Sequence, residues 1–172
     1  MDGARAGKLL SLCGGAEADI ARARPVLASY SRDVLHVGPL GAGQIAKTCN
    51  NLLHWQHAVG NFEALLLAKR YGLDAQKMRE VLLKSPGANG TLERFEEARF
   101  TWHEKDMDVV MELAQAGGLV LPLSGQVDQL IKLLRPADVT ALLHSSEVSY
   151  LGRSVTALPP ADGGLGNPYG KA

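Results

Sequence analysis

The feature that most constrains this fold is a long stretch without proline, which runs from residue 44 to residue 70. Apolar residues recur in it every three or four positions, the spacing of one face of an α-helix. They include Ile45, Cys49, Leu52, Val59 and Leu66. Gly72 follows the basic residues of "AKRY", as is typical of the end of a helix. The pattern predicts a single helix about 40 Å long, around which the rest of the chain must pack.

The segments after this helix predict further helices, with no strand beyond residue 45. Asp74 should cap a helix that Pro86 and Gly87 end. Pro122 suits the first turn of a later helix, and Pro136 should close it. The region 43–152 is therefore expected to be one helical domain. The segment 153–172 is rich in proline and glycine and is predicted to be a flexible tail.

The first residues have a different pattern. Two short apolar runs, "KLLSLCGG" and "DVLHVG", each end in glycine and flank a helical segment. Residues 8 to 37 are therefore predicted to form strand, helix and strand, although Pro25 should kink that helix or mark its start. Two strands and one helix cannot bury a sheet by themselves. Region 1–42 is thus expected to be the trailing edge of an α/β domain.

Composition excludes several classes of partner. Lys+Arg and Asp+Glu both number 18, which argues against binding nucleic acid or a membrane surface through a basic field. No apolar run approaches the roughly 20 residues that span a bilayer. The two cysteines have no metal-ligand spacing, and the five histidines form no ligand cluster. These features predict a soluble cytoplasmic protein with no metal site.

A polar stripe interrupts the start of the long helix. Lys47, Asn50, Asn51 and His54 lie at helical spacing on one face, directly after the glycine-rich "HVGPLGAG". Asparagine is unfavourable inside a helix because its amide competes for backbone hydrogen bonds. Two interpretations are open: a solvated surface, or a site where the lysine transfers a proton while an amide binds a hydroxyl or carboxylate.

The segment "GPLGAGQIAKTCNN" resembles the central motif of the β-hydroxyacid dehydrogenases, the family of 3-hydroxyisobutyrate dehydrogenase, tartronate semialdehyde reductase and 6-phosphogluconate dehydrogenase. Other segments that resemble the family are "GARAGKLLSLCGGAEADIARARPVL", "NFEALLLAKRYGLD" and "EKDMDVVMELAQAGGLVLPL". The resemblance covers residues 3 to 150. It implies a mainly α fold: the family's all-helical C-terminal domain, preceded by a small β-α-β remnant of a Rossmann domain.

The resemblance also implies roles for individual residues. Lys47 matches the catalytic lysine, Asn51 the substrate-binding asparagine, and Asn50 its support. Lys105 matches a lysine near the nicotinamide, with Asp106 beside it; both are also typical of an exposed helix start. The family's glycine turn, which lets substrate and cofactor approach the backbone, is matched by Gly38, Gly41 and Gly43.

No G-x-G-x-x-G occurs in the chain, so the implied site for NAD or NADP is incomplete. The first hypothesis is the C-terminal portion of a dehydrogenase that interconverts a short β-hydroxyacid and its semialdehyde and is inactive alone. It would act as a homo-oligomer or with a missing Rossmann half. The second is a non-catalytic helical dimerisation module. A third, an imine reductase, is disfavoured because those enzymes usually carry another residue where Lys47 stands.

Overall fold

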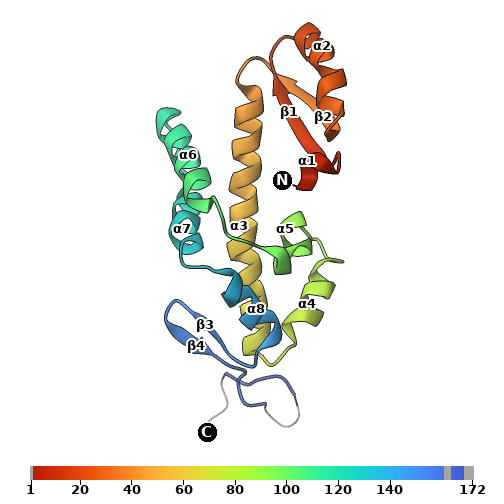
Figure 1. Ribbon diagram of the computed structural model, residues 1–172. Coiled ribbons are helices and arrows are strands. Elements are labelled where there is room, and N and C mark those ends of the chain that lie inside the picture. The colour runs from red at the N-terminus through yellow and green to blue at the C-terminus, as the bar shows by residue number, and fades with distance from the viewer. Residues whose placement is uncertain (1, 161–163, 169–172) are drawn as a thin grey trace. The chain divides into compact units, whose positions relative to one another are not determined.

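The computed structural model describes residues 2–160 and 164–168 and divides the chain into two compact units, Met1–Asn51 and Leu52–Ala172 (Figure 1). The helix predicted from the proline-free stretch is α3, Ala42–Arg70, and residues of α3 contribute to both units. The division falls inside α3, and the domain boundary expected between residues 42 and 43 stays a prediction. Each unit is described by itself below.

The first unit contains the predicted strand, helix and strand. Its elements are α1 (Asp2–Arg5), β1 (Leu9–Gly14), α2 (Glu17–Ala28) and β2 (Ser31–Gly38), followed by the start of α3. β1 pairs in parallel with β2, with Leu12 opposite Leu35. Pro25 lies in the last turn of α2, so it does not mark the start of the helix. The structure describes every residue of α2 and none is buried, so water can replace the backbone bond that proline removes.

The start of α3 packs directly on the end of β1, and two glycines make this possible. A Cβ atom on Gly43 would lie 2.5 Å from the backbone oxygen of Leu12. A Cβ atom on Gly14 would lie 2.6 Å from the backbone oxygen of Pro39. Both contacts are with backbone, which cannot rotate away as a side chain can. Glycine at both positions therefore sets how closely this helix and strand approach.

The second unit is built on the remainder of α3. Its other helices are α4 (Ala75–Leu82), α5 (Gly90–Glu93), the 3₁₀ helix η1 (Phe95–Glu97), α6 (His103–Ala116), α7 (Pro122–Ile131) and α8 (Pro136–His144). The predicted cap of α4 is confirmed, because the Asp74 carboxylate accepts a hydrogen bond of 2.8 Å from the Lys77 backbone N–H. The predicted proline at the start of α7 is also confirmed.

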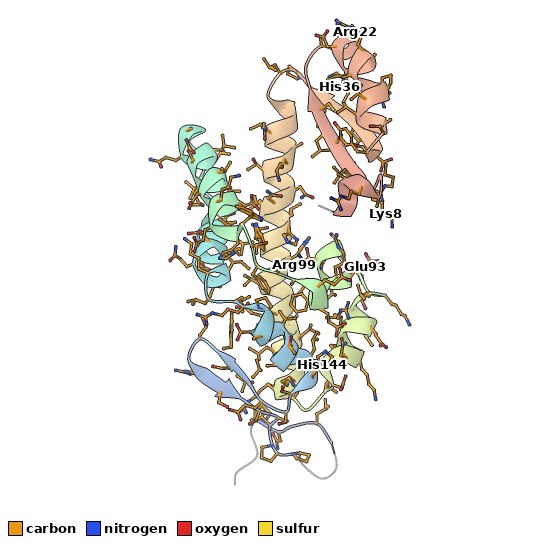
Figure 2. All side chains as sticks on the ribbon, viewed as in Figure 1. Lys8, Arg22, His36, Glu93, Arg99 and His144 are labelled. Carbon is orange, nitrogen blue, oxygen red and sulfur yellow. The ribbon has the colours of Figure 1, made fainter. Side chains whose placement is uncertain are left out.

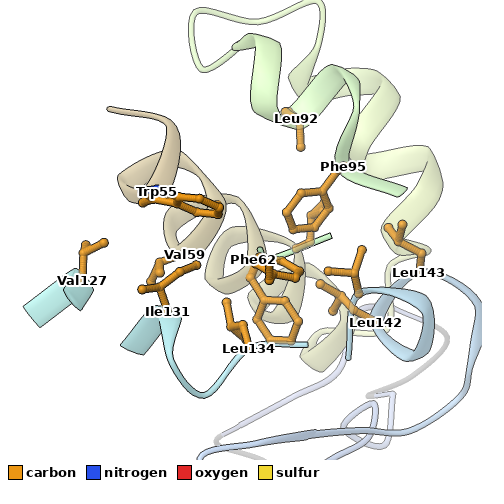
Figure 3. Packing of buried hydrophobic residues seen from close by; sticks show 14 of the residues in the cluster. Trp55, Val59, Phe62, Leu92, Phe95, Val127, Ile131, Leu134, Leu142 and Leu143 are labelled. Carbon is orange, nitrogen blue, oxygen red and sulfur yellow. The ribbon is translucent and has the colours of Figure 1, made fainter. Parts of the chain in front are cut away.

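The core of the second unit lies where α3, α5, η1, α7 and α8 meet (Figure 3). Phe62, Leu65, Phe95, Ile131 and Leu142 are fully buried in it. Burial of each such side chain contributes about 1.5–3 kcal/mol relative to exposure. The periodic apolar face predicted for α3 therefore does pack, over the length that belongs to this unit.

The prediction of no strand beyond residue 45 is wrong. β3 (Val148–Tyr150) and β4 (Arg153–Val155) form an antiparallel hairpin in which Tyr150 pairs with Arg153. The two loop residues, Leu151 and Gly152, have φ values of +50° and +75°, the left-handed backbone that tight two-residue hairpin loops require. The alternating β-formers of "VSYLGRSV" around Leu-Gly carried this signal, which the helical prediction missed.

Part of the predicted flexible tail is held by backbone hydrogen bonds. Residues 153–155 form β4, and the N–H of Leu158 donates to the backbone oxygen of Arg70 at 2.8 Å. The N–H of Gly166 donates to the oxygen of Tyr71 at 3.2 Å. Residues 161–163 and 169–172 of the predicted tail lie outside the described residues.

Candidate functional site

A pocket of about 790 Å³ lies in the first unit, between the end of β1 and the start of α3. Four of the residues predicted as site residues line it together: Lys47, Asn50, Gly41 and Gly43. The remaining lining residues are Leu10, Leu12, Gly14, Leu40 and Gln44. The glycine turn and two residues of the polar stripe, Lys47 and Asn50, thus face one cavity.

Helix geometry aligns the polar groups of this pocket. Gln44, Lys47 and Asn50 follow one another at three-residue steps along α3, so their side chains project from one face. Lys47 is exposed, and its ammonium makes no hydrogen bond or ion pair with the other described residues of its unit. The group is therefore free to bind a ligand oxygen. Gln44 was not predicted as a site residue, although its spacing from Lys47 could have indicated it.

The two asparagines occupy different positions. Asn50 lines the pocket, while Asn51 is half-buried and is not part of the lining. The Asn50 amide Nδ2 donates to the Asn51 Oδ1 over 3.4 Å, at the long end of a hydrogen bond. The two amides are thus in contact, and the predicted roles of Asn51 in substrate binding and of Asn50 as its support stay predictions.

Glycine is required at two positions of the turn, Gly41 and Gly43, for two different reasons. Gly41 has a φ of +92°, and a Cβ there would meet nothing within 4 Å, so its conformation requires glycine and its surface is open. Gly43 instead lies against the backbone of β1. Gly14 shares that contact and was not predicted as a site residue; the Gly-Gly that ends the first strand was its only signal.

The wall of the pocket is chemically divided. Leu10, Leu12 and Leu40 supply apolar surface, and Lys47 and Asn50 supply an amine and an amide. A lysine amine can accept a proton from a hydroxyl, and its ammonium can return the proton. An amide N–H can hold a carboxylate or alcohol oxygen. The arrangement can therefore orient a small hydroxyacid and move its hydroxyl proton.

Lys105 and Asp106 lie in the second unit, in the first turn of α6. Lys105 is exposed. Asp106 is half-buried, and its Oδ2 accepts a hydrogen bond of 3.2 Å from the indole N–H of Trp55 on α3. Asp106 therefore has a structural contact within its own unit, and the lining of the Lys47 pocket includes neither residue.

His54 also belongs to the second unit, where it is half-buried. Its Nδ1 shares a hydrogen bond of 2.9 Å with the Thr91 hydroxyl, and its ring lies 4.5 Å from that of Trp55. Burial, and then the nearby Arg94 guanidinium, lower the pKa of His54 below 6.5. Within the described part of the chain, no three His, Cys, Asp or Glu side chains gather as metal ligands, and no helix is long and apolar enough to cross a membrane.

Comparison with known proteins gives a family. Residues 41–151 match the family described as NAD-binding of NADP-dependent 3-hydroxyisobutyrate dehydrogenase. A 3-hydroxyisobutyrate dehydrogenase of Pseudomonas aeruginosa is 47% identical over 90 residues, which are 52% of this chain and 30% of that protein. A 2-(hydroxymethyl)glutarate dehydrogenase of Eubacterium barkeri is 30% identical over 141 residues, 76% of this chain and 47% of that protein.

The fold is also similar to that of a solved dehydrogenase structure. A structure of Mycobacterium tuberculosis 3-hydroxyisobutyrate dehydrogenase with L-serine matches with a TM-score of 0.68 and 28% identity, over 84% of this chain and 57% of that one. The chain thus spans less than two thirds of each of these relatives. Because all three are dehydrogenases, they do not favour the alternative of a non-catalytic dimerisation module.

The family implies NAD or NADP as the cofactor, and the residues present fit one end of it. The open surface at Gly41 leaves the backbone accessible to a flat ring, and Leu10 and Leu12 give that ring an apolar wall. The phosphate-binding G-x-G-x-x-G turn is not in the sequence. With its glycine turn, its Lys47 pocket and its match over residues 41–151, the chain belongs to the β-hydroxyacid dehydrogenase family, whose cofactor is NAD or NADP.

Proposed function

We propose that this chain supplies the proton-transfer and substrate-binding residues of an NAD- or NADP-dependent dehydrogenase that interconverts a short β-hydroxyacid and its semialdehyde. The observation that carries the proposal is that Lys47 and Asn50 line the same pocket beside the glycine turn. An amine and an amide one helical turn apart can hold both the reacting hydroxyl and a neighbouring oxygen of one small molecule.

The relatives indicate which substructure the substrate has. Their names and bound molecule give 3-hydroxyisobutyrate, 2-(hydroxymethyl)glutarate and L-serine. In all three, the carbon that bears a carboxylate also bears a CH₂OH group. The three molecules differ in the third substituent of that carbon. We infer that this chain acts on the same HOCH₂–CH(R)–COO⁻ unit.

Lys47 takes the central role in this reaction. A bound nicotinamide would supply hydride transfer to and from the carbon that bears the hydroxyl. The Lys47 amine accepts the hydroxyl proton during oxidation, and its ammonium returns the proton during reduction. Asn50 donates an amide hydrogen bond to a substrate oxygen, with Asn51 orienting it. Leu10, Leu12 and Leu40 give the reacting carbon an apolar surface to lie against.

We also infer that turnover requires a dinucleotide-binding domain with a glycine fingerprint, because this sequence contains none. The chain then corresponds to a C-terminal portion that is inactive alone. A homo-oligomeric state, a cytoplasmic location and a cofactor contact through Lys105, with Asp106 beside it, belong to the same proposal.

The test is turnover of 3-hydroxyisobutyrate and of L-serine with NAD and NADP. It should be measured for the chain alone and for the chain fused to the dinucleotide-binding domain of the Pseudomonas aeruginosa relative. In the active form, Lys47→Ala should lower turnover by about two to four orders of magnitude, as expected for a lost acid/base group.

Lys47→Arg is the matched variant. Arginine keeps the positive charge and cannot lose its proton. Oxidation should therefore fail in Lys47→Arg as it does in Lys47→Ala. Turnover near that of the unmodified chain in either variant would remove Lys47 from proton transfer. Activity restored in Lys47→Arg alone would show that the lysine acts only through its charge.

A further inference from the structure

His36 of β2 is outside the lining of the Lys47 pocket, yet it lies where the chain leaves the sheet and turns towards α3 (Figure 2). Its Nε2 is 2.8 Å from the Gly15 carbonyl oxygen and 3.0 Å from the Gly38 carbonyl oxygen. Carbonyl oxygens only accept hydrogen bonds, so the ring nitrogen between them must carry the hydrogen. One N–H thus bridges the residue after β1 and the last residue of β2.

The two carbonyl groups also belong to a closed set of hydrogen bonds. The Gly15 N–H donates to the Gly38 oxygen at 2.9 Å, so this oxygen accepts from both the Gly15 backbone and the His36 ring. Gly15 and Gly38 have φ values of +150° and +148°, which residues with a side chain rarely adopt. The His36 ring therefore joins two chain segments whose glycine backbone has unusual conformational freedom.

The pairing of β1 with β2 is irregular at the same place. Cys13 lies opposite His36. The next pair is Gly14 with Gly38, so Val37 is an extra residue on β2. An extra residue of this kind forms a β-bulge, which bends its strand and disrupts the ladder of backbone hydrogen bonds. Strand pairing therefore fixes the end of β2 less firmly than its middle, and the His36 side chain supplies an additional attachment.

Both attached segments continue into the wall of the Lys47 pocket. Gly15 directly follows Gly14, which lines the pocket at the end of β1. Gly38 precedes the turn at residues 39–41, which contributes to the lining and leads into α3. A shift of the end of β2 would therefore displace the start of α3, and Lys47 with it, relative to the wall that β1 forms.

We propose that His36 is a positioning residue for Lys47, whose Nε2–H holds the end of β1 to the end of β2 and so fixes the turn that starts α3. The role rests on the proposed function, in which Lys47 transfers the proton. The attachment needs an N–H group at the place of Nε2. Glutamine can supply it, because its amide nitrogen is the same number of bonds from Cα, whereas leucine has no donor.

The first experiment is NMR of the chain alone, with the ring nitrogen signals of His36 showing hydrogen on Nε2. Removal of the donor in His36→Leu should speed exchange of the Gly15 amide about five- to tenfold, the effect of one hydrogen bond. It should also shift the amide signals of Gly41 and Lys47. His36→Gln should restore slow exchange and the original signals. Amides in the middle of β1 should not change, which shows that the sheet remains folded.

Val37→Thr is the matched control for these variants. Val37 is the next residue of β2, and its side chain is 44% exposed. The change alters side-chain polarity beside His36 and leaves the Nε2–H attachment intact. Exchange of the Gly15 amide should therefore equal that of the unmodified chain.

The second experiment measures turnover in the active fusion with a dinucleotide-binding domain. His36→Leu should lower kcat about tenfold with little change in KM for the hydroxyacid, because the binding groups remain and only their alignment changes. His36→Gln should restore most of kcat. A merely structural side chain would not be replaced by a glutamine of different shape, so this recovery reports on the N–H group itself.

Three results would overturn the inference: unchanged exchange of the Gly15 amide in His36→Leu, equal effects of His36→Leu and His36→Gln, or an unaltered kcat when an active fusion carries His36→Leu. A fusion that shows no turnover even with the unmodified sequence would instead count against the proposed function. The exchange rates and the Lys47 signal of the chain alone would then decide whether His36 fixes the turn.

Discussion

The contact between Gly43 and the backbone of β1 gives a prediction whose size can be worked out. In Gly43→Ala, the new Cβ would lie 2.5 Å from the Leu12 oxygen and 3.2 Å from both the Gly14 nitrogen and the Leu12 carbonyl carbon. An unstrained carbon–oxygen contact is about 3.3–3.6 Å. The start of α3 must therefore move away from β1 by roughly 1 Å, because no side chain on either surface can rotate to relieve the contact.

The cost of Gly43→Ala can be compared with the cost of the same substitution at another glycine of α3. Overpacking costs about 1–3 kcal/mol, and the upper end applies because both surfaces are backbone. Alanine regains about 0.5–1 kcal/mol of helix propensity. The net loss in the first unit is then about 2 kcal/mol, or roughly thirtyfold in an opening equilibrium. Gly60→Ala is the control: Gly60 is also in α3, and a Cβ there would meet nothing within 4 Å.

Hydrogen exchange followed by mass spectrometry is the assay, because it reports on each segment separately. In Gly43→Ala, peptides that cover residues 9–14 should exchange roughly thirtyfold faster, while those from α7 and α8 should not change. Gly60→Ala should leave residues 9–14 unaffected and should not destabilise α3. Unchanged or slower exchange of residues 9–14 in Gly43→Ala would refute the reasoning, and so would equal acceleration in Gly60→Ala.

Three further predictions concern the second unit. Because the pKa of His54 is lowered on folding, the unfolded chain binds more protons below pH 6.5; the free energy of unfolding should fall as the pH drops below this value, and His54→Gln should reduce that slope in pH-dependent denaturation. The Asn61 and Asn89 amides exchange two hydrogen bonds of 3.0 Å; Asn61→Ala should cost about 1–3 kcal/mol, and a double-mutant cycle with Asn89→Ala that shows no coupling would contradict this pairing. Lys105→Ala should weaken NADPH binding about tenfold in a fluorescence titration, with the exposed Lys77→Ala as control; equal affinity of the two variants would exclude the proposed cofactor contact.

The predictions that succeeded from sequence depended on interactions between residues close together in the chain. The apolar period of α3 and the Asp74 cap are local, because helix hydrogen bonds and capping bonds join residues three or four positions apart. The two strands β1 and β2 were predicted from two apolar runs that each end in glycine. The resemblance named the family, and the match over residues 41–151 confirms it.

The hairpin at residues 148–155 was missed for a local reason as well. "ADVTALLHSSEVSYLG" was interpreted as one helix, but α8 ends at His144 and β3 begins at Val148. Leu151 occupies a left-handed position that leucine rarely adopts, so its residue type gave no turn signal. Burial of Val148 in the core of the second unit stabilises the strand.

The sequence and the tertiary structure also determined different features of the candidate site. The sequence by itself determined that Lys47 and Asn50 share a face of α3, because a helix turns by a constant angle at each residue. Only the tertiary structure decided that this face borders a pocket with β1, that Gly43 meets the Leu12 backbone, and that Asp106 binds the Trp55 indole. These contacts join residues separated by tens of positions, and no local period specifies which distant surfaces will meet.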